Sequence, residues 1–302
     1  MEIPITQSRE WQKLQESLGE TSFLREGNGF EYLAIVKPAP LGSYLYLPYG
    51  PVADTPAGLK NALKDLSELA KAENSVFIRI EPQNREDFAK IKLKNLKKSR
   101  DLSPRETWVL DLKGSDEEYR AKLPSRLLRY YKNREKNGIT IEASHNPSDI
   151  KYLLNLQKAL AKEKNISTFS ENYLKTELKQ PFATLYLVKK DQNVIAAGLV
   201  FDHGKTRYNL QGAQSDEGRK LHATGILTIQ LIEDARAKNL ERFDFWGIAP
   251  EGAPATHPWA GFTNFKKTFA GEQVNYVGTH DLVLKPLKYG LYNFFRKIRR
   301  ML

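Results

Sequence analysis

The chain contains no cysteine among its 302 residues. Without a thiol there is no disulfide framework, no thiolate nucleophile and no cysteine-ligated zinc site. Histidine is also scarce, and no two copies have the short spacing that places two metal ligands on one helix face. The five copies are His145, His203, His222, His257 and His280. We therefore expect no bound metal, and the composition fits a reducing cytoplasm.

Long apolar runs are missing as well. No stretch approaches the length that a bilayer-spanning helix needs. The first residues, MEIPITQSREW, are too polar for a secretory signal, so we expect none. Hydrophobic residues make up 40% of the chain and charged residues 27%, which is typical of a globular protein with a sizeable core. The expected location is the cytoplasm, and peripheral contact with the cytoplasmic membrane stays open.

The motifs of common catalytic classes are also absent. The sequence has no Gly-x-Ser-x-Gly nucleophile elbow, no Walker loop and no Rossmann glycine fingerprint. An enzyme without these features must rely on positioning two substrates and on electrostatic stabilisation.

Positive charge is abundant, with a formal net charge of +11 at pH 7. The excess is clustered in three stretches, which are KIKLKNLKKSR (90–100), RLLRYYKNREKN (126–137) and FFRKIRRML (294–302). Each stretch alone is compatible with a solvated surface. Together they favour a polyanionic partner, either a phosphate backbone or an anionic membrane face.

The same order of elements occurs twice: strand, strand, loop, helix, strand. β-branched and aromatic residues mark the strands, and apolar residues three and four apart mark the helices. The first set covers 30–37, 42–48, about 57–71 and 75–80, and the second covers 193–201, 206–212, about 226–238 and 242–246. This repetition predicts an α/β (α+β) protein with two tandem GNAT-like acyltransferase units, in which helices flank mixed sheets.

The segments outside the repeat are assigned by the same criteria. We expect a strand over 107–112, a long basic helix over about 116–137 with Gly138 as its C-terminal cap, and a strand over 139–143. The domain boundary is placed near Arg105. The final segment, from 281 on, predicts a strand and an amphipathic helix that packs on a domain, because Tyr292, Phe294 and Phe295 favour burial. Contact with a membrane surface is the alternative.

Acyl-CoA is disfavoured as a donor. The GNAT fold grips pyrophosphate with glycines whose backbone amides approach the phosphates closely. The corresponding loop here reads RKLHAT, so Arg219 is present but His222 and Thr224 occupy the glycine positions. The helix start beside Arg219 and Lys220 remains a candidate site for another anion.

The stretch AGFTNFKKTF places two lysines inside an aromatic segment. On a helix that advances ~100° per residue, Phe262, Phe265 and Phe269 form one apolar face. Lys267 then points into water, whereas Lys266 lies at the edge of the aromatic face. A partly desolvated ammonium there can stabilise negative charge on a carbonyl oxygen. The alternative is a lysine whose stem lies on the aromatics while its charge reaches solvent.

Several motifs together resemble the Fem family of peptidoglycan interpeptide-bridge aminoacyltransferases. They are GSYLYLPYGPV, then TWVLDL followed by the basic segment ending REKNGITIEAS, then RFDFWGIAP, and finally GFTNFKKTFAGE. The resemblance implies two tandem GNAT-like domains without the long helical arm of some members. Domain 1 would cover 1–105 with 277–302 returning to it, and domain 2 would cover 106–276.

The resemblance also implies roles for individual residues. Phe265 and Lys266 match a Phe-Lys pair near the tRNA acceptor end, where the lysine is proposed to assist transfer. Trp11 and Lys13 match a segment that contacts the phosphates of the nucleotide-linked precursor, and Tyr173 matches a tyrosine of the precursor-binding wall. Tyr208 and Arg219 are further candidates for substrate binding. Phe169 and Leu210 depart from the family pattern, where an arginine and a tyrosine are found.

The implied reaction needs no cofactor besides aminoacyl-tRNA as co-substrate. The amine of a stem-peptide residue attacks the aminoacyl ester of a charged tRNA, and the acceptor is a lipid-linked or UDP-linked peptidoglycan precursor. Two alternatives remain open. One is an N-acyltransferase of the same fold that uses acyl-CoA or another acyl donor, and the other is a non-catalytic module that binds RNA or a membrane surface.

Overall fold

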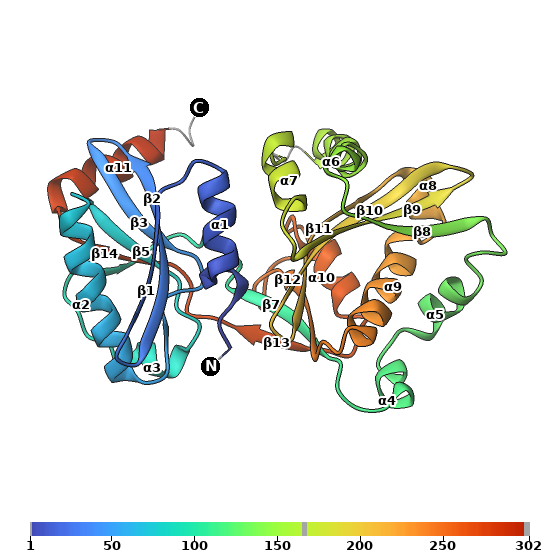
Figure 1. Ribbon diagram of the computed structural model, residues 1–302, viewed down its shortest axis with the longest axis horizontal. Coiled ribbons are helices and arrows are strands. Elements are labelled where there is room, and N and C mark those ends of the chain that lie inside the picture. The colour runs from blue at the N-terminus through green and yellow to red at the C-terminus, as the bar shows by residue number, and fades with distance from the viewer. Residues whose placement is uncertain (1, 165–167, 299–302) are drawn as a thin grey trace. The chain divides into compact units, whose positions relative to one another are not determined.

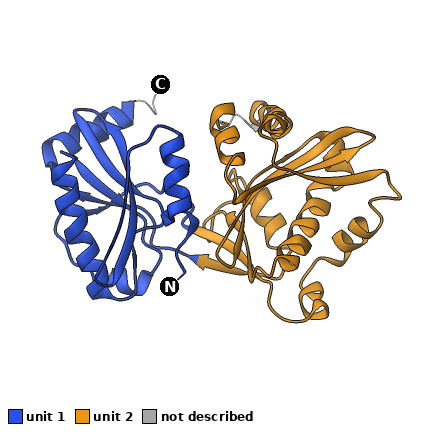
Figure 2. Cartoon of the chain, viewed as in Figure 1, with its two compact units in different colours: residues 1–105, 275–302 blue, residues 106–274 orange. Residues whose placement is uncertain are grey.

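The computed structural model describes residues 2–164 and 168–298, which form two compact units (Figures 1 and 2). Unit 1 comprises residues 1–105 and 275–302, and unit 2 comprises residues 106–274. Within the described residues each unit contains one seven-stranded mixed sheet with helices packed against it. No described helix is both long and apolar enough to cross a membrane.

The sheet of unit 1 has the order β1-β2-β3-β5-β14-β6, with β4 paired to β2. Its strands are β1 (Ser22–Gly27), β2 (Phe30–Ala39), β3 (Gly42–Leu47), β4 (Val52–Ala53), β5 (Phe77–Ile80), β6 (Leu96–Lys98) and β14 (His280–Val283). Its helices are η1 (Ile5–Gln7), α1 (Arg9–Ser17), α2 (Pro56–Ala72), α3 (Arg85–Ala89) and α11 (Pro286–Ile298).

The sheet of unit 2 has the order β13-β7-β12-β11-β10-β9-β8. Its strands are β7 (Glu106–Asp111), β8 (Ile139–Ser144), β9 (Ala183–Lys190), β10 (Asn193–His203), β11 (Thr206–Gln214), β12 (Arg242–Gly247) and β13 (Glu272–Asn275). Its helices are α4 (Asp116–Ala121), α5 (Ser125–Lys132), η2 (Pro147–Asp149), α6 (Ile150–Lys164), α7 (Glu171–Leu178), α8 (Asp216–Lys220), α9 (Ala223–Ala237) and α10 (Ala260–Lys266).

The two units repeat one arrangement. In unit 1 an antiparallel pair, β2 and β3, leads through α2 to β5, which pairs parallel to β3. In unit 2 β10 and β11 lead through α9 to β12, which pairs parallel to β11. On its other edge, β5 pairs antiparallel with β14, and β12 pairs in the same way with β7. The predicted α/β class with two GNAT-like units is therefore confirmed.

Local signals account for the long helices. The side chain of Thr55 accepts a hydrogen bond from Gly58 N, and Pro56 occupies the first turn, so α2 begins where both features favour a helix start. Helix α9 is apolar on most sides because it lies between the sheet and α5. It begins at Ala223, three residues before the predicted start at Ile226.

The predicted basic helix over 116–137 is wrong in its continuity. The structure has two short helices instead, α4 and α5, and Pro124 stands directly before the second one. Proline cannot donate the backbone hydrogen bond that a continuous helix needs at this position. Gly138 does not cap this helix as predicted, because α5 ends at Lys132 with Asn133 as its cap; its φ of +66° belongs to the turn before β8. The segment between β11 and α9, expected as a loop, contains the short helix α8.

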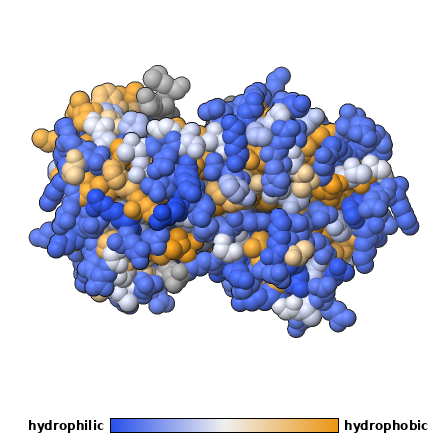
Figure 3. Space-filling view, in the orientation of Figure 1, coloured by the Kyte–Doolittle hydropathy of each residue, from blue (hydrophilic) through white to orange (hydrophobic). Residues whose placement is uncertain are grey.

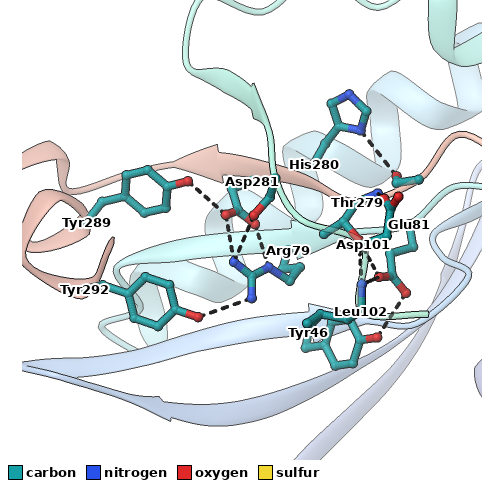
Figure 4. A network of polar contacts seen from close by, with 12 residues as sticks. Tyr46, Arg79, Glu81, Asp101, Leu102, Thr279, His280, Asp281, Tyr289 and Tyr292 are labelled. Atoms are coloured by element: carbon teal, nitrogen blue, oxygen red, sulfur yellow. Dashed lines mark hydrogen bonds and ion pairs between the residues drawn. The ribbon is translucent and has the colours of Figure 1, made fainter. Parts of the chain in front are cut away.

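A buried polar network fixes the C-terminal segment to unit 1 (Figure 4). Arg79 on β5 makes two hydrogen bonds to Asp281 on β14, with Nε to Oδ1 at 2.7 Å and Nη2 to Oδ2 at 2.8 Å. Both side chains are at most 1% exposed. The hydroxyls of Tyr289 and Tyr292, on α11, bond to Asp281 and Arg79 respectively. Strand β14 and helix α11 are therefore integral parts of unit 1.

Helix α11 buries only part of the aromatic residues that were expected to pack on a domain. Tyr292 packs against Phe77 and Tyr44 as predicted, but Phe294 and Phe295 are exposed. The side of α11 that carries Tyr289 and Tyr292 faces the sheet, and this orientation turns the two phenylalanines outward. Residues 299–302 of the third basic stretch lie outside the described residues.

Candidate active site

Lys266 is the last residue of α10 and lies at the end of β12. Its ammonium nitrogen donates a hydrogen bond of 2.6 Å to the backbone oxygen of Gly247. The side chain is largely removed from water, and this burial lowers the pKa of Lys266 to about 8, while the neighbouring carboxylate of Asp244 opposes the shift. An ammonium held in this way is a fixed positive charge with little solvent around it.

The orientation of α10 is set by Thr263. Its hydroxyl donates to Trp259 O and accepts from Ala249 N, both at 2.8 Å. These bonds connect the helix to the loop after β12 and direct its Thr263 and Lys266 side inward. Phe262, one turn before Lys266, is nevertheless 49% exposed. The predicted apolar face of three phenylalanines is therefore wrong for Phe262.

The other aromatic residues of this segment are packed. Phe269 is fully buried beyond the end of α10, and Phe265 lies partly buried against it, with ring centroids 5.5 Å apart. Lys267 is exposed, as predicted, and its ammonium lies 5.6 Å from the ring centroid of Trp108. The two adjacent lysines thus occupy different environments: Lys266 is largely buried, whereas Lys267 is exposed.

Asp244 on β12 is the acidic residue whose charge acts on Lys266. Burial raises its pKa to about 7, whereas the backbone N–H of Trp246 and the charge of Lys266 favour the ionised form. The Trp246 N–H donates to Oδ1 of Asp244 at 2.7 Å. Trp246 itself has φ +64°, a strained backbone conformation for a tryptophan, of the kind found at functional sites. Sequence analysis overlooked Asp244, although an acid in the aromatic strand RFDFW was a visible signal.

Strands β11 and β12 diverge at this point. Their parallel pairing covers only three residues and ends at Tyr208 and Asp244, although β11 continues to Gln214. Beyond Tyr208 no described strand pairs with this side of β11. Tyr208 is buried and its ring stands edge-on to Trp246, with centroids 6.1 Å apart. Tyr208 and Lys266 therefore belong to the same end of the sheet.

A second polar cluster of unit 2 contains Tyr173. Its hydroxyl interacts with Glu177, and Gln211 Nε2 on β11 donates to Glu177 Oε2 at 2.8 Å. Burial raises the pKa of Glu177 to about 8, so this acid is largely protonated at neutral pH. Phe169 is exposed and stacks on Tyr173 with centroids 5.0 Å apart. Glu177 is a second buried acid that the sequence did not single out.

Arg219 lies on α8, apart from these groups. Its side chain is half exposed and forms an ion pair of 3.3 Å with Asp216 on the same helix. The nearby start of α9 is occupied by protein: Tyr130 of α5 stacks on His222, and Thr224 N donates to Gln214 Oε1. These contacts leave little room for a pyrophosphate at this helix start.

The packing of α5 on α9 leads to the same conclusion. A Cβ atom on Gly225 would lie 2.6 Å from a terminal methyl group of Leu127, so the Leu127 side chain of α5 lies directly against the first turn of α9. The helix that would carry acyl-CoA phosphates in a GNAT unit is thus covered at its first turn. The acyl-CoA alternative is correspondingly less favoured.

Trp11 and Lys13 lie on α1 in unit 1. Trp11 is buried at 7% exposure, whereas Lys13 is exposed on the opposite side of the helix. A pocket of unit 1 lies elsewhere, at the Gly-Pro loop, and is lined by Tyr49, Pro51, Val52, Ala53, Leu59, Pro82, Gln83, Asn84 and Asp87. This lining contains no cation, so it does not suit a phosphate. The two predicted precursor contacts are not part of this pocket.

The second basic stretch presents its cations to solvent. On α5, Arg126, Arg129 and Lys132 are exposed, and within the described chain no ion pair neutralises them. Arg126 and Arg129 flank the ring of Tyr130. Among the described residues, no group of His, Cys, Asp or Glu is arranged to hold a metal ion.

Comparison with solved structures identifies the fold. FemX superposes with a TM-score of 0.81 at 18% identity, covering 95% of this chain and 94% of FemX. The C-terminal domain of a proposed lysylphosphatidylglycerol synthetase from Agrobacterium fabrum matches with a TM-score of 0.61 at 16% identity, covering 94% and 90%. L-PGS from Bacillus licheniformis matches with a TM-score of 0.57 at 15% identity, covering 99% of both chains.

Sequence comparison identifies the family. No curated protein matches the chain by sequence. The model of the FemAB family, however, matches residues 113–297, which is more than half of the chain. The resemblance predicted from the motifs is thereby confirmed, and the chain belongs to the FemAB family.

Proposed function

We propose that this FemAB-family aminoacyltransferase transfers an amino acid from aminoacyl-tRNA to the stem-peptide amine of a peptidoglycan precursor. In coarser terms, the chain is an enzyme of aminoacyl transfer in cell-wall or lipid synthesis. The observation that carries the proposal is the ammonium of Lys266, which is buried beside Asp244 where β11 and β12 diverge.

Lys266 provides the electrostatic part of the mechanism. When the acceptor amine attacks the ester carbonyl of the donor, negative charge develops on the carbonyl oxygen. A cation that is already desolvated stabilises this oxyanion strongly, because no water has to reorganise during the reaction. With a pKa of about 8, Lys266 is protonated about ten to one at pH 7 and can carry this charge.

The bond changes then balance without a protein nucleophile. A C–N bond forms between the acceptor amine and the aminoacyl carbon, and the ester C–O bond to the ribose breaks. The attacking nitrogen loses a proton and the ribose oxygen gains one. Asp244 fixes the charge of Lys266 in this scheme, and Tyr208 lies at the same end of the sheet.

The diverging strands support an extended substrate. Backbone N–H and C=O groups of β11 beyond Tyr208 can pair with the main chain of a peptide, independently of its side chains. We assign the stem peptide to this edge, with Tyr173 and Phe169 as candidate contacts farther along the same unit. Trp11, Lys13 and Arg219 stay candidates for phosphate groups of the substrates.

The positive charge supports a polynucleotide donor. On α5 the guanidinium groups of Arg126 and Arg129 lie near the ring of Tyr130. Such a combination is suited to phosphate contacts and to stacking on bases. Aminoacyl-tRNA is made in the cytoplasm, so the reaction is assigned to that compartment, and no cofactor beyond the charged tRNA is needed.

The test is a transfer assay with the purified full chain. Charged tRNA pools are incubated with the UDP-linked precursor, the lipid-linked precursor or phosphatidylglycerol, and the product mass is measured. The proposal expects one precursor to gain the mass of an amino acid residue in a ribonuclease-sensitive reaction. Aminoacylated phosphatidylglycerol alone would move the function to lipid modification, and no mass gain with any acceptor would refute aminoacyl transfer.

A further inference from the structure

Helix α11 has two apolar sides, and only one of them is covered. Tyr289 and Tyr292 face the sheet of unit 1 and complete a small buried cluster with Phe77 and Val283. The other side carries five large apolar residues that are between 38% and 88% exposed, namely Leu287, Leu291, Phe294, Phe295 and Ile298. We call these five residues the α11 apolar face.

The five residues form a continuous stripe. At ~100° per residue, they fall within an arc of about 100° along the helix. Leu41, in the turn between β2 and β3, adds a sixth exposed apolar side chain. It lies close to α11, because Lys288 Nζ donates to the backbone oxygen of Leu41 at 3.0 Å. Figure 3 shows the corresponding hydrophobic surface over α11 at the upper left.

The charged residues of α11 have one sign. The sequence of α11, PLKYGLYNFFRKI, contains no acidic residue. On the helical projection Lys288 and Lys297 border the stripe on opposite edges, and Arg296 lies behind it. An apolar stripe flanked by cations matches an interface between hydrocarbon and anionic headgroups.

We propose that the α11 apolar face binds the surface of an anionic phospholipid bilayer, with α11 lying in the plane of the interface. At thirteen residues α11 is too short to span a bilayer. A second copy of the chain fits less well, because two such faces would bring their flanking cations together. Lipid phosphates complement those cations, and the acyl chains complement the leucines and phenylalanines.

The inference is separate from the proposed transfer reaction. It rests on surface residues of unit 1, whereas Lys266 and Asp244 belong to unit 2. Binding is measured without tRNA or precursor, so its failure leaves the transfer proposal intact. Conversely, a failed transfer assay leaves vesicle binding unaffected.

The experiment is flotation of the full chain with vesicles. One set contains only phosphatidylcholine, and the other contains phosphatidylcholine and phosphatidylglycerol in a 3:1 ratio. We expect the apparent affinity for the anionic vesicles to exceed that for the neutral ones by about tenfold or more, and to fall as salt is raised.

Substitutions locate the contact. Leu291→Glu combined with Phe294→Glu is expected to lower the affinity for anionic vesicles by about tenfold or more. Leu102→Glu is the matched control, because Leu102 is 48% exposed in the same unit and lies outside the three basic stretches. Leu287→Ser is a second probe that should reduce binding without disturbing packing, since this side chain is 88% exposed. Circular dichroism verifies that each variant is folded.

Three outcomes would overturn the inference. The first is that the chain fails to float with phosphatidylglycerol vesicles. The second is that the Leu291→Glu, Phe294→Glu variant and the Leu102→Glu control bind equally well. The third is a concentration-dependent dimer that the same two substitutions dissociate, which would assign the face to a second copy.

Discussion

Each unit of this protein buries a cation near a carboxylate, and the two pairs are built differently. In unit 1 Arg79 and Asp281 form a direct bidentate ion pair in which both side chains are inaccessible to water (Figure 4). In unit 2 the described side chains of Lys266 and Asp244 make no direct ion pair. Lys266 donates to the carbonyl of Gly247 instead, and Asp244 accepts from the N–H of Trp246.

The difference appears in the protonation equilibria. Desolvation disfavours the charged form of Arg79, but the hydrogen bonds and the charge of Asp281 outweigh it and raise the pKa of Arg79, so the guanidinium stays charged. For Lys266 and Asp244 burial dominates, and the pKa values move to about 8 and about 7. The direct pair therefore keeps the charge of Arg79 fixed and serves the structure, whereas the indirect arrangement leaves Lys266 and Asp244 able to gain or lose a proton near neutral pH.

The largest expected effect follows from breaking the direct pair. Arg79→Met leaves Asp281 as a buried carboxylate with only the Tyr289 hydroxyl as a strong remaining side-chain donor. We expect the free energy of unfolding to fall by about 3–5 kcal/mol in urea denaturation. Arg25→Met is the control, because its pair with Asp65 is exposed and contributes less than about 1 kcal/mol. Equal losses in both variants would contradict a special structural role for the buried pair.

The next effect concerns catalysis. Lys266→Met keeps an unbranched side chain but removes the charge, so we expect the transfer rate constant to fall by about 10²–10³-fold. Lys267→Met is the matched control at the adjacent, exposed position and should change the rate by less than about twofold. Single-turnover rates with saturating acceptor measure both. Comparable rates for Lys266→Met and Lys267→Met would exclude the proposed role of Lys266.

The smallest effect tests the coupling of Asp244 to Lys266. Ionised Asp244 raises the pKa of Lys266, so Asp244→Asn should shift the alkaline loss of activity from about pH 8 to lower pH. The loss occurs on the alkaline side because only protonated Lys266 stabilises an oxyanion. A pH–rate profile whose alkaline limb is identical in both proteins would show that the two groups are not coupled.

Stability gives an independent measurement on the same variant. The folded pKa of Asp244, about 7, exceeds the value of ~3.9 for an unfolded aspartate, so the native state binds the extra proton between these values. The contribution of Asp244 to stability is therefore present at low pH and is lost as pH rises toward 7. Asp244→Asn should flatten the dependence of the urea midpoint on pH between 5 and 7. An unchanged slope would indicate that Asp244 ionises normally.

Much of the fold was predictable because local patterns determine it. β-branched and aromatic residues in the strands, and apolar spacing of three and four residues in the helices, were sufficient to detect the repeated unit. Thr55 and Pro56 mark the start of α2. The break at Pro124 is also visible in the sequence, because a proline inside a helical segment disfavours a continuous helix. Family membership was predictable from ordered motifs, none of which is specific alone.

The site was less predictable because tertiary contacts determine it. The inward side of α10 is selected by the bond from Ala249 N to Thr263, fourteen residues apart, and a helical projection of AGFTNFKKTF contains no information about that bond. The burial of Asp244 and Glu177 likewise depends on neighbours from distant segments. For α11 the sequence shows two apolar sides, but only the bonds of Tyr289 and Tyr292 establish which side faces the sheet.

Strand β14 has a consequence for how the molecule is made. It lies between β5 and β6, so residues 280–283 separate two strands that are encoded within the first hundred positions. During synthesis the sheet of unit 1 lacks its penultimate strand until residues 280–283 have been made, whereas unit 2 is built from the single continuous segment 106–274. The sequence of unit 2 is therefore complete before that of unit 1. A fragment that ends at position 105 would lack β14, and it would expose the side of β5 where Asp281 normally pairs with Arg79.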